Sequence, residues 1–376
     1  MAARRGAVTE EKSWLITGGA GFIGSNLIRW LLLEQPASQA PVRLINLDKL
    51  TYAGNLANLK EVETDPRYCF VHGSMGDKTL VAEILRQHQV GVLLHLAAES
   101  HVDRSIDEPE QFARTNVLET VSLLETVLQY WKELPRKEAQ RFRFVHVSTD
   151  EVFGSLLPQE EPFTEKTPYN PSSPYAASKA GADHFVRAYG RTFGLPVVLT
   201  HSSNNYGPYQ FPEKLLPLTI LNALEERPLP LYGDGLQVRD WIYVLDHCRA
   251  LHRVIHKGKP GESYAIGGGV QISNLDLVRK VCRILDERRP RPGGKKHEEL
   301  LCFVADRPGH DRRYATNPSK IVRELGWKPL EDLESGLAKT VDWYLAHQDW
   351  CREITEKRYA RQRLGLRASS RNEYAG

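Results

Sequence analysis

Short apolar runs alternate with amphipathic segments through the first half of the chain. Strand-like runs are expected at residues 14–16, 42–47, 68–71, 90–96, 142–147 and 196–200. Segments with helical spacing of apolar positions lie between them, among them 26–34, 79–87, 111–132 and 174–193. Apolar strands that alternate with helices are typical of parallel strands joined by right-handed crossovers and buried on both faces. The pattern therefore predicts an α/β fold with a doubly wound parallel sheet.

The pattern changes after residue 200, where prolines become frequent and the expected strands and helices become short. We expect a smaller C-terminal α/β domain there, with some elements returning to the sheet. Residues 288–299 (RRPRPGGKKHEE) are polar and rich in proline and glycine, which predicts a surface loop. The predicted division is 1–200 for the main domain, 201–345 for the smaller domain, the two interleaved, and 346–376 for a basic tail.

Composition narrows the class of protein. The chain has 376 residues, of which 41% are hydrophobic and 26% charged, as in globular proteins. The formal net charge is +3, and residues 352–376 hold seven Lys or Arg against three Asp or Glu, or +4. The rest of the chain carries a net charge of −1, which predicts no surface for binding nucleic acid. We interpret the basic tail as a solvated end rather than an anion-binding segment.

The cellular compartment is predicted from sequence features that the chain lacks. Its apolar runs are too short to span a membrane, and the first residues, MAARRGAVTEEKSW, contain no apolar stretch typical of a secretory signal. The five cysteines are scattered without a CxxC pair, which argues against a disulfide framework and a metal site. We expect a cytoplasmic enzyme in a reducing compartment.

A glycine-rich turn directly follows the first expected strand. Gly18, Gly21 and Gly24 have the spacing GxxGxxG, which allows a tight turn, close approach of a pyrophosphate and close packing of the next helix. Asp48, at the end of the second strand, would accept hydrogen bonds from a ribose diol and favour NAD over NADP, a preference that Lys49 weakens slightly. These features predict a Rossmann-type site for NAD. The alternative is a purely structural turn.

Tyr175 and Lys179 are four residues apart near the start of an expected helix, so they share one face. An ammonium beside a phenol would lower the phenol pKa toward neutrality and make it a base for an alcohol oxidised by NAD. The alternative is an ordinary amphipathic helix.

Thr149, Asp150 and Glu151 follow the fifth expected strand, where doubly wound sheets bind ligands. Neighbouring carboxylates push one pKa upward, so one group can keep a proton while the other is ionised. The pair would supply an acid and a base at one site. The alternative is a solvated turn.

Together these features resemble the extended short-chain dehydrogenase/reductase family, whose members share the glycine turn, the YxxxK pair and a hydroxyl residue after strand five. Longer stretches are similar to the dTDP-glucose 4,6-dehydratases within it, from about residue 15 to 343. They are LAAESHVDRS (96–105), STDEVFG (148–154), SPYAASKA (173–180), SSNNYGP (202–208), FPEK (211–214), VRDW (238–241) and DRPGH (306–310).

The resemblance implies a tightly bound NAD, a dTDP-glucose substrate and a homodimer paired through the helices near 111–132 and 174–193. It implies oxidation at C4, elimination of water across C5 and C6, and return of hydride to C6, giving a 4-keto-6-deoxy sugar for deoxysugar or rhamnose biosynthesis. The enzyme would be a lyase of the hydro-lyase class.

The implied catalytic roles fall on five residues. Tyr175, aided by Lys179 and Thr149, would remove the proton of the 4-hydroxyl group. Glu151 would take the C5 proton, and Asp150 would protonate the departing C6 hydroxyl group.

The implied binding residues form two sets. The residues expected at the cofactor are Gly18, Gly21, Phe22, Ile23, Gly24, Asp48, Lys49, Leu50, Thr51, Ser74, Met75, Leu96, Ala97, Ala98, Ser100, Thr115, Tyr175, Lys179 and Asn205. The residues expected at the nucleotide sugar are Ser100, Thr149, Asn204, Lys214, Leu215, Pro230, Tyr232, Arg239, Asn274, Asp306, Arg307 and His310. Among these, the planar guanidinium of Arg239 suits a bidentate clamp on a diphosphate.

Two positions depart from the family pattern. Ser74-Met75 stands where the family commonly has Asp-Ile at the adenine, which puts the affinity for NAD in question, and Phe153 replaces a usual tyrosine.

Two alternatives stay open at this point. One is a 4-epimerase or a 4,6-dehydratase for another nucleotide sugar, such as UDP-glucose, since thymine and uracil differ by one methyl group. The acidic pair argues against the epimerase, which needs no elimination acid or base. The other is a non-catalytic NAD-dependent binding protein, against which the intact catalytic set argues.

Overall fold

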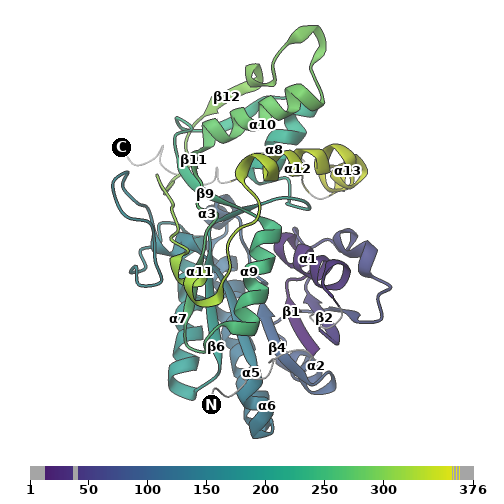
Figure 1. Ribbon diagram of the computed structural model, residues 1–376, viewed down its shortest axis with the longest axis vertical. Helices are drawn as coiled ribbons and strands as arrows, with labels where there is room; N and C mark the ends of the chain where they lie inside the picture. Colours follow the sequence, from purple (N-terminus) through teal and green to yellow (C-terminus); the bar gives the residue numbers. More distant parts are fainter. Residues whose placement is uncertain (1–12, 37–40, 358, 360, 362–363, 365–376) are drawn as a thin grey trace.

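A parallel sheet of seven strands forms the centre of the computed structural model, which describes residues 13–36, 41–357, 359, 361 and 364 (Figure 1). The strand order is β10-β6-β5-β4-β1-β2-β3. The strands are β1 (Ser13–Thr17), β2 (Arg43–Asp48), β3 (Tyr68–His72), β4 (Val90–His95), β5 (Arg143–Thr149), β6 (Val197–Ser202) and β10 (Ser263–Ile266). All neighbouring pairs are parallel, so the predicted doubly wound fold is confirmed.

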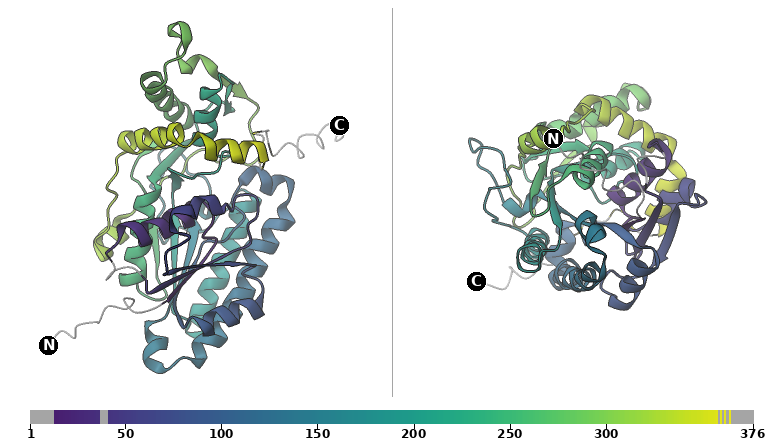
Figure 2. Two further views of the ribbon diagram at one scale, coloured as in Figure 1. Left: turned by 90° about the vertical axis from the view of Figure 1, so that its right-hand side faces the viewer. Right: turned by 60° about the horizontal axis from the view of Figure 1, so that its bottom comes forward.

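Helices cover both faces of this sheet because successive strand residues point to opposite sides (Figure 2). Trp14 and Ile16 join the core beneath one helix layer, whereas Leu15 between them joins the core beneath the other. The first layer contains α1 (Phe22–Arg29), its π-helical continuation η1 (Trp30–Glu34), α9 (Val244–Lys257) and α11 (Ser319–Leu325). The second contains α2 (Lys78–Gln87), α5 (Thr120–Glu133) and α7 (Pro174–Phe193).

The helix that positions the catalytic pair is α7, whose predicted bounds are confirmed. Ser173 caps its first turn by accepting from the backbone N–H of Ala176, and Pro174 occupies its first position. Gly194, in a left-handed conformation, ends it. The other long predicted helix is less regular: it comprises α4 (Pro109–Phe112), the π-helix η3 (Ala113–Glu119) and α5.

A smaller unit lies beyond one end of the sheet (Figure 1). It holds a three-stranded sheet of β7 (Asn204–Tyr206), β9 (Val238–Tyr243) and β11 (Gln271–Ser273), and a parallel pair of β8 (Leu229–Tyr232) and β12 (Leu301–Val304). Its helices are α8 (Leu215–Leu224), α10 (Asn274–Arg288), α12 (Leu333–Ala346) and α13 (Gln348–Lys357). β10 belongs to the main sheet, and α9 and α11 pack on that sheet, so the two units share their chain.

The short elements lie in the connections. They are η2 (Leu56–Val62), α3 (Val102–Asp107), α6 (Arg136–Arg141), η4 (Asp150–Phe153), η5 (Pro292–Gly294) and η6 (His297–Leu300). The last two fall in the expected surface loop 288–299. His297 departs from that expectation: it is buried, with Nδ1 2.8 Å from a carboxylate oxygen of Asp286.

The structure describes little of the two ends of the chain. Residues 1–12 and most of 358–376 lie outside the described residues, and so does most of the basic tail; its described first part forms α13. None of the described helices combines the length and the apolar character that crossing a bilayer requires.

Candidate active site

A cavity of about 300 Å³ opens at the carboxyl ends of β1, β4 and β5, and residues of both units line it. This is the edge at which parallel α/β sheets bind ligands. The five expected catalytic residues and most of the expected cofactor residues face it.

The glycine turn has the geometry that a dinucleotide requires. Gly18 has a φ of +75°, and a Cβ there would lie 2.7 Å from the backbone of Ala97. A Cβ on Gly24 would lie 2.4 Å from the carbonyl oxygen of Gly18. A Cβ on Gly21 would meet only that oxygen, at 3.4 Å, so the middle glycine faces open cavity. With no side chain capping the start of α1, this turn fits the pyrophosphate of NAD.

Asp48 stands at the rim of the same cavity and also fixes the turn. Its two carboxylate oxygens accept hydrogen bonds from the backbone N–H groups of Ala20 at 2.9 Å and Leu50 at 2.8 Å. Burial raises the pKa of Asp48, and these two hydrogen bonds oppose the rise. Lys49 beside it pairs with Glu119 at 3.0 Å, which directs its charge away from Asp48.

Seventeen of the nineteen expected cofactor residues line the cavity; Leu50 and Ser74 do not. The Leu50 backbone serves Asp48 instead. The hydroxyl group of Ser74 donates to Glu119 at 2.6 Å, while Met75 does line the cavity. Ser74 therefore does not reach the cavity wall where the cofactor contact was expected, because its hydroxyl group is hydrogen-bonded to Glu119.

The catalytic residues come from three elements. Thr149 ends β5, Asp150 and Glu151 open η4, and Tyr175 is the second residue of α7. The side chain of Thr149 hydrogen-bonds the phenol of Tyr175. The Tyr175 ring packs edge-on against Phe112 with centroids 6.3 Å apart.

The expected lowering of the Tyr175 pKa is wrong for the protein alone. Burial raises its pKa well above the usual value, the charges of Glu151 and Asp150 raise it further, and only the bond with Thr149 lowers it appreciably. Lys179, expected to oppose this, donates instead to the carbonyl oxygen of Val147 at 2.9 Å. Burial lowers the pKa of Lys179 to about 8.

The two carboxyl groups differ as expected. Burial raises the pKa of Asp150 well above its usual value, and the charges of Glu151 and then Asp240 add to the rise. Thr316 donates to Asp150 at 3.2 Å. Burial also raises the pKa of Glu151, but the positive charges of Arg307, Lys214 and Arg239 oppose the rise. Asp150 is thus the group better suited to hold a proton and Glu151 the group better suited to accept one.

The smaller unit supplies the positive charge around Glu151. Lys214 lines the cavity and donates to the carbonyl oxygen of Ser100 at 2.9 Å. Arg239 is buried, stacks on Tyr314 at 4.2 Å and donates to the carbonyl oxygen of Asp311.

Four of the twelve expected sugar-nucleotide residues line this cavity: Ser100, Thr149, Asn204 and Lys214. The other eight do not: Leu215, Pro230, Tyr232, Arg239, Asn274, Asp306, Arg307 and His310.

Four of these eight, Tyr232, Asp306, Arg307 and His310, belong to one polar group, in which His310 pairs with Asp306 at 2.6 Å. Asp103 accepts from Tyr232 at 2.8 Å and from Arg307 at 2.9 Å. His310 lies in the same region, with its ring 6.2 Å from that of Tyr232.

Sequence reasoning missed Glu213, which lines the cavity, and the two side chains that bind it. Glu213 accepts from Tyr52 at 2.9 Å and from Arg104 at 3.0 Å, and the Arg104 guanidinium lies 3.9 Å from the centre of the Tyr52 ring. Glu213 lies within FPEK, and Asp103 and Arg104 lie within LAAESHVDRS. The two motifs could have drawn attention to these residues, but a motif does not show which side chains contact one another in the folded chain.

The whole chain is similar to proteins of known activity. The family model described as GDP-mannose 4,6 dehydratase matches residues 15–340. A dTDP-glucose 4,6-dehydratase of Xanthomonas campestris is 52% identical over 353 residues, covering 94% of this chain and 99% of the relative. The chain belongs to the dTDP-glucose 4,6-dehydratase family. An Escherichia coli member is 51% identical over 362 residues, with the same coverage of 94% and 99%.

Solved structures of family members have the same fold. DesIV, the dTDP-glucose 4,6-dehydratase of Streptomyces venezuelae, was solved with NAD and TYD bound. It is 46% identical, with a TM-score of 0.82 over 91% of this chain and 99% of that chain. A UDP-glucose 4-epimerase of Thermotoga maritima is more distant, at 26% identity and a TM-score of 0.76 over 89% and 99% of the two chains. The dehydratase branch is therefore favoured over the epimerase.

Proposed function

We propose that this protein is a NAD-dependent dTDP-glucose 4,6-dehydratase, a hydro-lyase that makes dTDP-4-keto-6-deoxyglucose for deoxysugar biosynthesis. The observation that carries the proposal is the convergence of Asp150, Glu151 and Tyr175 on one cavity whose other end is the glycine turn. The near-full-length identity with dTDP-glucose 4,6-dehydratases supports the choice of substrate.

The three glycines and Asp48 line the cofactor end of the cavity, where they would hold the pyrophosphate and the adenosine ribose of NAD. When bound, NAD would accept a hydride from C4 of the hexose and later return it to C6, with a proton added at C5, and would contribute one positive charge to the site.

Tyr175 takes the proton of the sugar 4-hydroxyl group. Its raised pKa means that the phenolate forms only when the surrounding charge becomes more positive. A proton on Asp150 removes one of the two opposing negative charges, and Thr149 stabilises the phenolate as a hydrogen-bond donor. Oxidation is therefore favoured when Asp150 is protonated, and the elimination step needs the same protonated Asp150.

Elimination uses the acidic pair. A ketone at C4 makes the C5 hydrogen acidic, and Glu151 removes it while Asp150 protonates the C6 hydroxyl group, which leaves as water. Lys214, Arg239 and Arg307 hold Glu151 toward its ionised form and suit the diphosphate of the substrate. Asp150 is buried and Glu151 half-buried, and closure of the site around the bound sugar would keep bulk water from the intermediate.

The remaining expected contacts stay part of the proposal. Tyr232, Asp306, Arg307 and His310 lie on the smaller unit, where the nucleotide would extend from the hexose. The cytoplasmic location and the role of the basic tail stay predictions.

The proposed assembly is a homodimer through η3, α5 and α7. Leu118, Phe185 and Phe193 on these helices are 60%, 43% and 44% exposed, which is unusual for large apolar side chains on regular helices. Light scattering should give twice the chain mass of 42.7 kDa. Phe185→Asp should give the monomer mass, whereas Leu157→Asp, at a loop position that is 65% exposed, should leave the dimer intact.

The test of the activity is incubation with dTDP-glucose and, in parallel, UDP-glucose, followed by nuclear magnetic resonance of the products. The proposal predicts a 4-keto-6-deoxy product from dTDP-glucose in preference to UDP-glucose. A 4-epimer without keto sugar, or binding of NAD without turnover, would contradict it.

A further inference from the structure

A fully buried carboxylate lies directly behind the catalytic pair, outside the cavity. Tyr175, Lys179 and Asp183 follow one another at four-residue steps on α7, so all three share one helix face. Asp183 is 0% exposed and does not line the cavity, and so it touches neither cofactor nor substrate.

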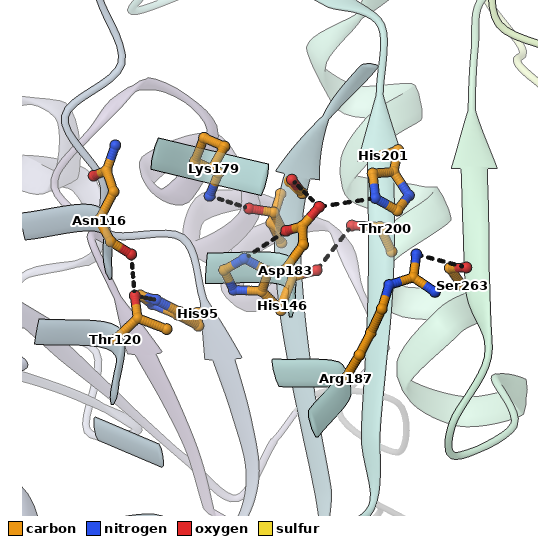
Figure 3. Close-up of polar contacts among 12 residues, drawn as sticks. His95, Asn116, Thr120, His146, Lys179, Asp183, Arg187, Thr200, His201 and Ser263 are labelled. Atoms are coloured by element: carbon orange, nitrogen blue, oxygen red, sulfur yellow. Dashed lines mark hydrogen bonds and ion pairs between the residues drawn. The ribbon is translucent and has the colours of Figure 1, made fainter. Parts of the chain in front are cut away.

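Four neighbouring side chains surround this carboxylate, of which Figure 3 labels His146 and His201. Ser148 of β5 and Tyr169 donate to its Oδ2 at 2.9 Å, and Nε2 of His201 on β6 lies 3.0 Å from the same atom. Nε2 of His146 on β5 lies 3.1 Å from its Oδ1. Such a set of polar partners favours the charged form, and the pKa of Asp183 is lowered despite its burial.

Besides Lys179, two basic side chains border this anion: His201, with Nε2 3.0 Å from Oδ2, and Arg187, which reaches the carboxylate through Tyr169. Burial lowers the pKa of His146 to about 4 and that of His95 on β4 well below its usual value, so both rings are neutral at neutral pH. Arg187, one turn further along α7, donates to Tyr169 and to Ser263. Lys179 therefore faces two neutral imidazoles across β4 and β5, and Asp183 is the negative charge that favours its ammonium form.

We propose that Asp183 is a positioning residue for the oxidation step, a buried anion that keeps Lys179 protonated and seated on β5 beneath the reacting groups. This inference rests on the proposed function, because it takes over the role in the C4 oxidation that the family resemblance implies for Lys179. Among the described residues, the acceptor for Lys179 is the carbonyl oxygen of Val147, so without Asp183 its ammonium would lose the negative charge that favours it.

The inference predicts a specific change in the pH profile. The protonated form of Lys179 is the active one, so activity falls as pH rises through its pKa of about 8. Removing the Asp183 charge lowers that pKa further, and the alkaline limb should move down by roughly one pH unit. At pH 8 kcat should fall several-fold, while at pH 6 it should stay close to wild type, with KM for dTDP-glucose nearly constant at both.

The experiment compares kcat and KM from pH 6 to 9 for wild type, Asp183→Asn and Asp183→Glu, with melting temperatures for each. Asp183→Glu retains the negative charge, so the alkaline limb of its pH–rate profile should lie where the wild-type limb lies. Ser148→Ala is the matched control, because it removes one neutral donor from the same carboxylate and should leave the limb in place. If Asp183→Asn is obtained unfolded, Asp183→Ser carries the same test, since it leaves room for water among the donors.

An equal loss of activity at all pH values, with an unmoved limb, would overturn the inference and leave Asp183 a structural residue. An unmoved limb with full activity would overturn it as well. Absence of a keto product from the wild-type enzyme would instead refute the proposed function, so the two failures are distinguishable.

Discussion

Glu151→Gln should separate the two halves of the reaction. The substitution removes the proposed C5 base while keeping nearly the same shape. It also removes the charge that, after burial, does most to raise the pKa of Tyr175. Oxidation at C4 should therefore proceed at least as easily as in wild type, and elimination should stop.

The magnitude follows from the loss of a general base. Such a group typically contributes roughly 10² to 10⁴-fold, or about 3–5 kcal/mol of transition-state stabilisation. The fold should tolerate the change, because the amide replaces a carboxylate whose pKa is already raised by burial. Product formation should fall by that factor with little change in the free energy of unfolding.

The assay mixes the NAD-loaded enzyme with dTDP-glucose and follows the near-ultraviolet absorbance of NADH together with the keto product. We expect a lasting absorbance increase with almost no product. Tyr175→Phe should show neither signal, and Glu161→Gln, at an exposed carboxylate of the following loop, should behave as wild type. Near wild-type product from Glu151→Gln would refute the assignment of the base.

Three other predictions concern the turn, the phenol and the lysine. Gly24→Ala places a methyl group 2.4 Å from a backbone oxygen and should lower the melting temperature, whereas Gly21→Ala should keep the fold but weaken binding of NAD, as calorimetry would measure. Thr149→Val removes the hydrogen bond that lowers the phenol pKa, so the acid limb of the pH–rate profile should move to higher pH. Lys179→Met removes a cation whose pKa falls from 10.5 to about 8 on folding, a shift that costs the folded protein about 3 kcal/mol. Loss of the lysine hydrogen bond offsets about 1 kcal/mol of the stability gained. The inactive variant should thus be about 2 kcal/mol more stable at pH 7 by denaturant unfolding, whereas the exposed control Lys166→Met should be neutral. Since the folded-state pKa of this cation is depressed, wild-type stability should also rise between about pH 8 and 10.5, and that rise should be absent in Lys179→Met.

The sheet could be predicted from the sequence because its strands are buried on both faces. Continuous apolar runs such as 90–96 and 142–147 leave little choice of structure, and all six predicted strands formed. The seventh, β10, was not predicted as a strand, because Ser263–Ile266 is short and lies far along the chain from its partner β6.

The chemistry of the site was predictable only where sequence neighbours carry it. Thr149, Asp150 and Glu151 are adjacent, and the burial of Thr149 and Asp150 at a strand end follows from β5 itself. The pKa of Tyr175 was predicted in the wrong direction, because its sign depends on burial and on the carboxylates, not on Lys179 alone.

Contacts between distant segments carried no such signal. Asp183 gathers groups from β5, β6 and the loop before α7, and only the folded chain brings them together. The pairing of Asp103 with Arg307 spans the two units in the same way.

The most direct test of the account follows the hydrogen that leaves C4. The enzyme would be given dTDP-glucose carrying deuterium at C4, with no external reductant, and the product examined by nuclear magnetic resonance. One cavity that performs oxidation, elimination and reduction in sequence predicts deuterium in the C6 methyl group of a 4-keto product. Deuterium returned to C4, or lost to the solvent, would contradict it.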